Sequence, residues 1–136
     1  MQNLTCRVAT PNAENKATIS GLHPFAGGSD LAACSGDMLL QSLVACSGVT
    51  FAAVATAMNL KVSTTKIEAN GLMDFRGTLG VDRTVPVGLT GIELSFHIHT
   101  EEPDDKIEKL VQLTERYCVV LQTLTQGVNV SSTRTT

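Results

Sequence analysis

The sequence predicts a single α+β domain that covers residues 1–136. Three features indicate it: one long apolar stretch of helical length, two segments rich in Val, Thr and Ile, and an amphipathic helix near the C-terminus. The chain has 136 residues, of which 43% are hydrophobic, and this suffices for one domain with its own core. No internal repeat or linker divides the sequence.

Two short strands are expected first, at Leu4 to Ala9 and Ala17 to Gly21. The turn-forming residues Pro11 and Asn12 lie between them. The segment 22–34 is rich in glycine and other residues that end regular structure, so it is predicted to be a loop. Its glycines do not form a phosphate-binding motif, because neither of the two spacings typical of such loops is present.

A buried helix is predicted for Met38 to Leu60, a stretch without any charged residue. Ser35 and Asp37 supply its cap and an acidic first turn. The stretch is also long enough to span a bilayer, but polar residues interrupt it and no basic residue flanks it, so we expect no membrane partner. A helix that is apolar on all sides exceeds what one small domain can cover, and the sequence therefore predicts an obligate dimer.

The second half of the chain alternates strands with helices. A strand is expected over Lys61 to Phe75, a turn or long hairpin loop over Arg76 to Gly88, and another strand over Ile92 to Thr100. An amphipathic helix opens at Pro103 with two acids after it, and closes at Cys118. A short apolar piece and a final strand near Val128 to Ser131 complete the prediction.

Composition excludes several classes of function. Ten Lys plus Arg stand against 13 Asp plus Glu, without a basic run, so no nucleic-acid partner is expected. The N-terminus lacks the apolar core of a signal peptide, which predicts a cytoplasmic protein. His97 and His99 alternate on one strand face, but no third ligand stands near them in sequence, so a polar sheet face is favoured over a metal site and no cofactor is expected.

Four cysteines, at positions 6, 34, 46 and 118, have neither the density of a disulfide scaffold nor the short spacing of a zinc site. Cys46 is near the middle of the apolar helix, and Cys118 continues the apolar spacing of the amphipathic one. Both sulfurs are therefore expected to face a core, where they could approach each other as a redox pair. On the residues alone, two inert buried thiols are favoured.

Two strings around these cysteines change that preference. GDMLLQSLVACSGVT, which contains Cys46, and TERYCVVLQTL, which contains Cys118, resemble the two cysteine motifs of the OsmC/Ohr family of organic hydroperoxide reductases. The resemblance runs from residue 22 to the last predicted strand and is that of a shortened, divergent member. It implies an OsmC-like α+β homodimer, intertwined, in which antiparallel β-sheets from both subunits wrap two long central helices.

The resemblance also implies residue roles. Cys46 would be the peroxidatic residue, oxidised to a sulfenic acid by an organic hydroperoxide, and Cys118 the resolving residue that forms an intramolecular disulfide with it. A dithiol such as a lipoyl group would then reduce the disulfide. Asp37 matches a position where relatives carry a catalytic Glu. It lies nine residues before Cys46, about 13 Å along a straight helix, so the two side chains cannot touch within that helix. A catalytic role would therefore need a kink before Cys46 or a contact across the dimer interface. In the alternative, Asp37 is an acid at the helix N-terminus that offsets the macrodipole.

The cation expected to activate the Cys46 thiol has no obvious match. Arg7 lies on an early strand, as the arginine of the family does, but corresponds poorly to it. Arg76, Arg83 and Arg116 are substitutes by charge alone, and each is more typical of a solvated surface residue. Cys6 and Cys34 are expected to have no special role.

A second class of function stays open from the sequence. The same dimer could have lost the activating arginine and serve as a non-catalytic module that binds a small apolar ligand or senses oxidants. In either case we expect an apolar pocket near Cys46, lined by residues such as Leu43, Val49 and Phe51.

Overall fold

The computed structural model describes residues 4–10, 16–29 and 31–135. Two compact units make up the chain: residues 1–41 with 69–93, and residues 42–68 with 94–136. Cys46 and Cys118 both belong to the second unit, whereas Asp37 belongs to the first. The predicted turn at Pro11 and Asn12 lies outside the described residues.

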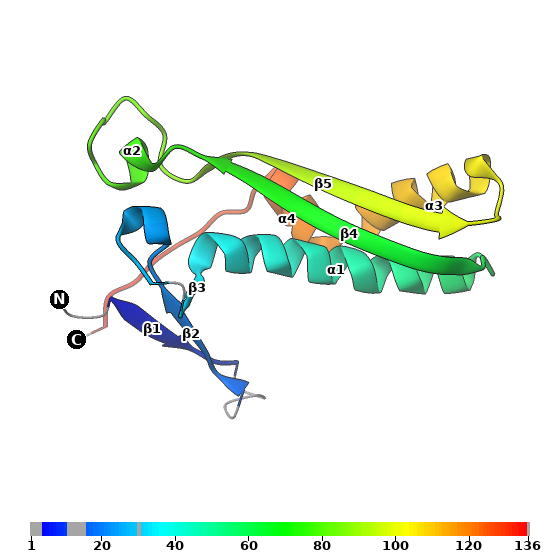
Figure 1. The fold of residues 1–136 in the computed structure, drawn as a ribbon, viewed down its shortest axis with the longest axis horizontal. Helices are drawn as coiled ribbons and strands as arrows, with labels where there is room; N and C mark the ends of the chain where they lie inside the picture. Colours follow the sequence, from blue (N-terminus) through cyan, green and yellow to red (C-terminus); the bar gives the residue numbers. More distant parts are fainter. Residues whose placement is uncertain (1–3, 11–15, 30, 136) are drawn as a thin grey trace. The chain divides into compact units, whose positions relative to one another are not determined.

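The elements confirm the α+β class (Figure 1). In chain order they are β1 (Thr5–Val8), β2 (Thr18–Gly21), the 3₁₀ turn η2 (Pro24–Ala26), β3 (Ala33–Cys34), α1 (Ser35–Ala57), β4 (Val62–Met73), α2 (Phe75–Thr78), β5 (Leu89–Thr100), α3 (Asp104–Tyr117) and α4 (Val119–Gln126). Each strand predicted before residue 101 is present, within a few residues of its expected bounds.

In the first unit, β1 and β2 pair antiparallel, with Thr5 opposite Gly21, and the short β3 pairs parallel to β2. The parallel pairing brings Ala32 against Gly21: a Cβ on that glycine would lie 2.8 Å from the Cβ of Ala32. The sequence therefore uses glycine here for close approach of the backbone. β3 was not predicted, because two residues inside a glycine-rich loop carry no strand signal.

Helix α1 starts at Ser35, three residues before the predicted helix, and ends where Asn59 adopts a left-handed conformation with φ of 54°. The Leu60 N–H then donates to the Ala55 carbonyl oxygen at 2.9 Å, the long hydrogen bond of a Schellman stop. By length and composition, the 23-residue helix could cross a membrane.

One stripe of α1 is buried, and its members lie four residues apart: Leu43, Ser47, Phe51 and Ala55. In the second unit this stripe meets the core, where Phe51 stacks on Phe96 of β5 with ring centroids 6.1 Å apart and Leu110 of α3 is fully buried. Other positions of α1 remain open in the single chain, and Val49 is 74% exposed. One stripe of this apolar helix is thus covered within one chain.

β4 and β5 form a two-stranded sheet. The Thr100 hydroxyl donates to the Lys61 carbonyl oxygen at one end, and the Thr90 hydroxyl donates to the Leu72 carbonyl oxygen at the other, so the pair is antiparallel (Figure 1). The loop between them contains the single helical turn α2, which Asp74 caps by accepting from the Arg76 N–H.

The C-terminal region differs from its prediction. The short apolar piece after Cys118 is the helix α4, and residues 127–135 are neither helix nor strand. The final strand expected near Val128 to Ser131 was wrong, because no strand of the described residues pairs with it. Val128 and Val130, whose alternation suggested the strand, are both exposed.

Candidate active site

Cys46 and Cys118 meet in the second unit, and this confirms the expectation that two thiols distant in sequence share one interior. The Cys46 sulfur accepts a hydrogen bond from the Cys118 side chain. Cys118 is completely buried, whereas Cys46 is half-buried. Both are free thiols. The more exposed sulfur is thus Cys46, which is the arrangement that a small oxidant requires if Cys46 reacts first.

The backbone explains why the Cys118 sulfur points inward. Cys118 is the junction between two helices: its N–H donates to the Thr114 carbonyl oxygen at 2.9 Å and ends α3, while its carbonyl oxygen accepts from the Gln122 N–H at 2.9 Å and begins α4. Its own backbone is extended, with φ of −71° and ψ of 107°. The Cys118 side chain caps neither helix, so its sulfur is available for contacts with α1.

Hydrogen bonds to the sulfur lower the pKa of the Cys46 thiol. The largest cause is the backbone N–H of Val120; burial opposes it, and the Cys118 side chain, the Val119 N–H and the Thr50 side chain add to it. Val119 and Val120 are the first two residues of α4. Amides in the first turn of a helix have no hydrogen-bond partner within the helix and lie at the positive end of the helix macrodipole, so they stabilise an anion placed next to them. The arrangement therefore stabilises a thiolate at Cys46.

Sequence reasoning missed these amides because it did not identify α4 as a helix. A signal was present: Gly127 follows Gln126 and ends the helix with φ of 71°, and glycine is the residue favoured just after a helix. The segment has only eight residues and no side-chain cap, so its sequence pattern was too weak to predict a helix.

A further side chain touches this pair. The hydroxyl oxygen of Ser47, the residue after Cys46, lies 3.4 Å from the Cys118 sulfur. Ser47 and Cys118 are both fully buried. The sequence analysis gave Ser47 no role, since serine inside a helix usually bonds its own backbone.

In the part of the chain that the structure describes, the groups that lower the Cys46 pKa are uncharged donors. Among the arginines considered from the sequence, Arg76 forms a close ion pair with Asp74, at 2.6 Å between Nη2 and Oδ2, which holds the pKa of the Asp74 carboxyl below its usual range. Arg116 lies over the ring of Tyr117, 5.7 Å from its centroid. Arg7 and Arg83 belong to the first unit.

Asp37 lies in the first turn of α1 and is exposed. α1 continues through Cys46 as one helix, so Asp37 lies nine positions before Cys46 along it. Asp37 borders a cavity of about 360 Å³ in the first unit, whose lining includes His23, Cys34 and Gln41. Its catalytic role and its alternative role toward the macrodipole both remain predictions.

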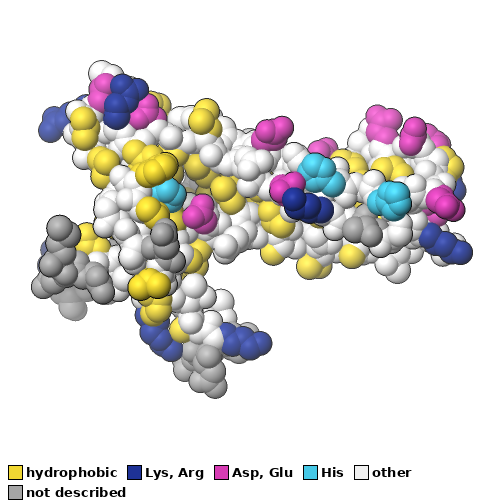
Figure 2. Space-filling view, viewed as in Figure 1, with side chains coloured by type: hydrophobic (Ala, Val, Ile, Leu, Met, Phe, Trp, Pro, Cys, Tyr) yellow, Lys and Arg dark blue, Asp and Glu magenta, His cyan; other side chains and the backbone are white. Residues whose placement is uncertain are grey.

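His97 is part of a polar sheet face. Its Nε2 lies 2.9 Å from Glu68 Oε2, and Lys66 Nζ lies 2.7 Å from Glu68 Oε1. Figure 2 shows histidine, acidic and basic side chains next to one another on this surface. Hydrogen bonding from Lys66, and secondarily the nearby His97, lowers the pKa of the Glu68 carboxyl. Within the described ranges, no three His, Cys, Asp or Glu side chains gather closely enough to hold a metal ion.

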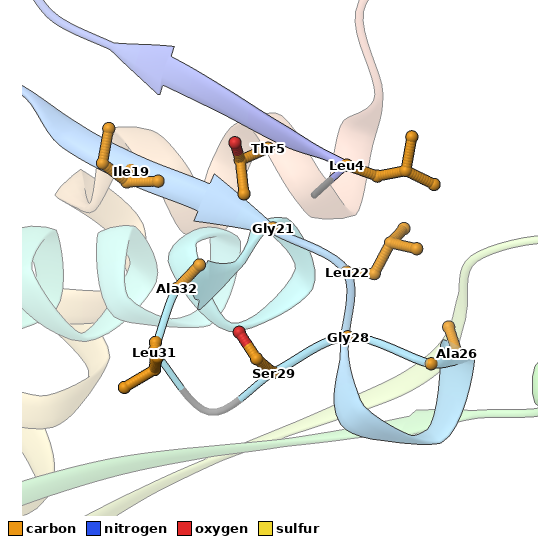
Figure 3. A pocket seen from close by; sticks show the side chains of 11 residues that line it. Leu4, Thr5, Ile19, Gly21, Leu22, Ala26, Gly28, Ser29, Leu31 and Ala32 are labelled. Atoms are coloured by element: carbon orange, nitrogen blue, oxygen red, sulfur yellow. The ribbon is translucent and has the colours of Figure 1, made fainter. Parts of the chain in front are cut away.

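The expected pocket wall beside Cys46 needs correction. Leu43 is fully buried and Phe51 is 5% exposed, so these side chains belong to the core and present no surface to a ligand. Val49 is exposed. A cavity of about 760 Å³ lies instead in the first unit, beside the β1–β2 pair (Figure 3). Its lining is mainly apolar and includes Leu4, Ile19, Leu22 and Leu31.

Comparison with known proteins identifies the fold. Residues 27–133 match the family model described as OsmC-like protein. No curated protein matches the sequence. Solved structures do: an OsmC-like protein from Mycoplasma pneumoniae is 19% identical, with a TM-score of 0.69, and the match covers 94% of this chain and 89% of that one.

Two further similar structures have names that refer to hydroperoxides. The organic hydroperoxide resistance protein OsmC from Legionella pneumophila is 14% identical, with 91% of this chain and 89% of that chain covered and a TM-score of 0.61. The organic hydroperoxide resistance protein OhrB of Bacillus subtilis is 16% identical, with 93% and 92% covered and a TM-score of 0.53. At these identities the likeness establishes the fold.

Proposed function

Because the chain belongs to the OsmC-like family, we propose that it is a thiol-dependent peroxidase that reduces organic hydroperoxides. The single observation that supports this most is the contact of the Cys46 sulfur with both the Cys118 side chain and the first amides of α4. One contact supplies a second thiol, and the other stabilises a thiolate. The names of the Legionella and Bacillus structures support organic hydroperoxides as the substrate class.

In the first step, the Cys46 thiolate attacks the terminal oxygen of the hydroperoxide. A sulfur–oxygen bond forms, the oxygen–oxygen bond breaks, and the alkoxide leaves and takes up a proton to become the alcohol. The sulfur becomes a sulfenic acid. The Val119 and Val120 N–H groups assist this step by raising the fraction of Cys46 that is thiolate at neutral pH.

In the second step, Cys118 attacks the Cys46 sulfenic acid as a thiolate. A disulfide bond forms, the sulfur–oxygen bond breaks, and the hydroxide takes up a proton to leave as water. Because the two side chains already form a hydrogen bond in the reduced protein, the approach needs little movement. A dithiol reductant such as a lipoyl group then returns both cysteines to thiols.

The dimer is part of this proposal. α1 buries one stripe and leaves Val49 74% exposed, and Figure 2 shows hydrophobic side chains on the surface of the single chain. A second copy would cover the open side of α1. It would also give Asp37 a route to a Cys46 of the partner, which the straight helix denies it within one chain. A cytoplasmic location, where thiols stay reduced, fits the four free cysteines.

Two observations favour the second candidate function, a non-catalytic dimer that binds a small apolar ligand or senses oxidants. Within the described residues, the groups that lower the Cys46 pKa are uncharged, and the first unit has a mainly apolar cavity of about 760 Å³. Uncharged donors stabilise a thiolate less than a guanidinium would. A sensor would react with peroxide once and turn over slowly.

Steady-state peroxide consumption distinguishes the two functions. The reduced protein is mixed with a lipoyl dithiol and either an alkyl hydroperoxide or hydrogen peroxide. The peroxidase proposal expects repeated turnover with the alkyl hydroperoxide and slower turnover with hydrogen peroxide. Consumption that stops after one equivalent per chain would favour the sensor, and no consumption at all would favour the ligand-binding module.

A further inference from the structure

We propose that Ser47 is a positioning residue for the resolving step: its hydroxyl donates to the Cys118 sulfur and directs that thiol at Cys46. The inference rests on the peroxidase proposal for its biological meaning. It concerns the 3.4 Å approach of Ser47 Oγ to Cys118 Sγ, a contact between the residue after Cys46 and the second cysteine.

Burial makes this contact obligatory. Ser47 and Cys118 are both 0% exposed, so water does not reach the hydroxyl. A buried hydroxyl without a hydrogen bond destabilises the fold, and each buried polar side-chain atom of the described residues has a partner. The partner of Ser47 is a sulfur 71 positions away in sequence.

Two other helical hydroxyls in this chain behave differently. Thr56 donates to the Ala52 carbonyl oxygen at 2.8 Å, and Thr114 donates to the Leu110 carbonyl oxygen at 2.8 Å, four residues earlier in each case. That is the usual local bond of a hydroxyl inside a helix. Ser47 reaches across to another element, so its hydroxyl links α1 to the junction between α3 and α4.

The single proton of a thiol sets the direction of this bond when Cys46 is a thiolate. In that state the Cys118 side chain donates its hydrogen to the Cys46 sulfur and lowers the pKa of Cys46. Cys118 has no second hydrogen to give, so Ser47 is then the donor to Cys118. The three side chains form a chain of donors that runs from Ser47 O–H to Cys118 S–H and ends at the Cys46 sulfur. Cys46 is a titratable side chain in contact with Cys118.

The Ser47 hydroxyl can assist the step in which Cys118 attacks the oxidised Cys46. When Cys46 has become a sulfenic acid, Cys118 must lose its proton and attack with a negatively charged sulfur. A hydroxyl that already donates to that sulfur strengthens its bond as the charge develops. Ser47 thus stabilises the attacking thiolate and keeps its side chain turned toward Cys46, without touching the hydroperoxide.

The test uses the Ser47→Ala variant, with Ser47→Thr to restore the hydroxyl and Thr56→Ala as a matched loss of a helical hydroxyl on the same helix. One equivalent of cumene hydroperoxide is added to each reduced protein. Sulfenic acid on Cys46 is trapped with a dimedone-type reagent, and the Cys46–Cys118 disulfide is followed by mass spectrometry over a range of pH.

For Ser47→Ala we expect disulfide formation to slow by about tenfold and its pH profile to move to higher pH, because one hydrogen bond to a charged sulfur is lost. Trappable sulfenic acid should accumulate. Ser47→Thr should recover most of the rate, and Thr56→Ala should match the unmodified protein. Disulfide formation in Ser47→Ala at the unmodified rate and with the unmodified pH profile would overturn the proposal.

A second arm separates this proposal from the peroxidase proposal. Oxidised lipoamide replaces the hydroperoxide, so that Cys46 forms a mixed disulfide with it and Cys118 then displaces the lipoyl thiol. Slow resolution in Ser47→Ala should appear here too. If the unmodified protein forms no sulfenic acid but Ser47→Ala is slow with oxidised lipoamide, the peroxidase proposal fails and the Ser47 proposal stands. Equal rates with oxidised lipoamide would overturn the latter.

Discussion

The backbone N–H of Val120 donates to the Cys46 sulfur, which joins the start of α4 to the middle of α1. An amide in the first turn of a helix lacks an intrahelical partner, so this donor is available without any loss to the helix. The positive end of a short helix therefore helps to stabilise a thiolate at Cys46.

Removal of one such amide should reduce the reactivity of Cys46. Val119→Pro deletes an N–H at the first position of α4, where proline is tolerated, and the extended backbone of Cys118 before it suits a proline. Val119→Ala keeps the N–H and is the control. We expect Val119→Pro to raise the pKa of Cys46 and to slow its alkylation at neutral pH severalfold, measured site by site with peptide mass spectrometry. Identical pH profiles for the two variants would rule out a contribution from this amide.

The lowered pKa of Cys46 also makes the stability of the folded protein depend on pH. The folded state releases its thiol proton at a lower pH than the unfolded state, whose thiol titrates near pH 8.5. The resulting stabilisation is fully present above the unfolded pKa and is lost as pH falls through the folded pKa. Cys46→Ser should therefore lose more stability, relative to the unmodified protein, in mildly alkaline buffer than in mildly acidic buffer. Chemical denaturation at several pH values measures this, and parallel curves would contradict it.

The core of the second unit should depend strongly on Leu110. Its side chain is completely buried and packs with Phe51 and Ala55 of α1. Leu110→Ala removes three carbons and leaves a cavity, so we expect the free energy of unfolding to fall by about 2–5 kcal/mol. Lys109→Ala, at the exposed neighbouring position of α3, should change it by less than about 0.5 kcal/mol. Denaturant titration compares them, and equal effects would show that α3 does not pack as described.

The open side of α1 should be the dimer surface. Val49 is 74% exposed in the single chain, and a charge there would be buried unpaired if a second copy covers it. Sedimentation at micromolar concentration should find a dimer for the unmodified protein and a shift toward monomer for Val49→Asp. Val87→Asp, at a position 76% exposed in the loop before β5, is the control and should stay dimeric. A monomeric unmodified protein would contradict the dimer proposal.

The helices and central strands could be predicted because their signals are local. The uncharged stretch around α1, the acids after Pro103 and the Val- and Thr-rich strands all have periodicity or capping that requires no knowledge of the fold. The final strand could not be predicted correctly, because Val128 and Val130 alternate like a strand while pairing depends on a neighbour.

The cysteine pair was accessible to sequence reasoning, but its environment was not. Apolar spacing indicated that Cys46 and Cys118 face the interior, and the structure confirms their contact. The donors to Cys46 are backbone amides of Val119 and Val120, and an amide is present at nearly every residue, so no residue type marks it in a sequence. Ser47 was overlooked for the related reason that its partner is 71 residues away.

The central claim is that Cys46 is oxidised first and Cys118 resolves it. The most direct measurement is mass spectrometry of the reduced protein, Cys46→Ser and Cys118→Ser after one equivalent of an alkyl hydroperoxide, with peptide mapping. We expect a Cys46–Cys118 disulfide within one chain, a trappable sulfenic acid on Cys46 in Cys118→Ser, and no reaction in Cys46→Ser. A sulfenic acid on Cys118 in Cys46→Ser, or oxidation confined to Cys6 and Cys34, would contradict it.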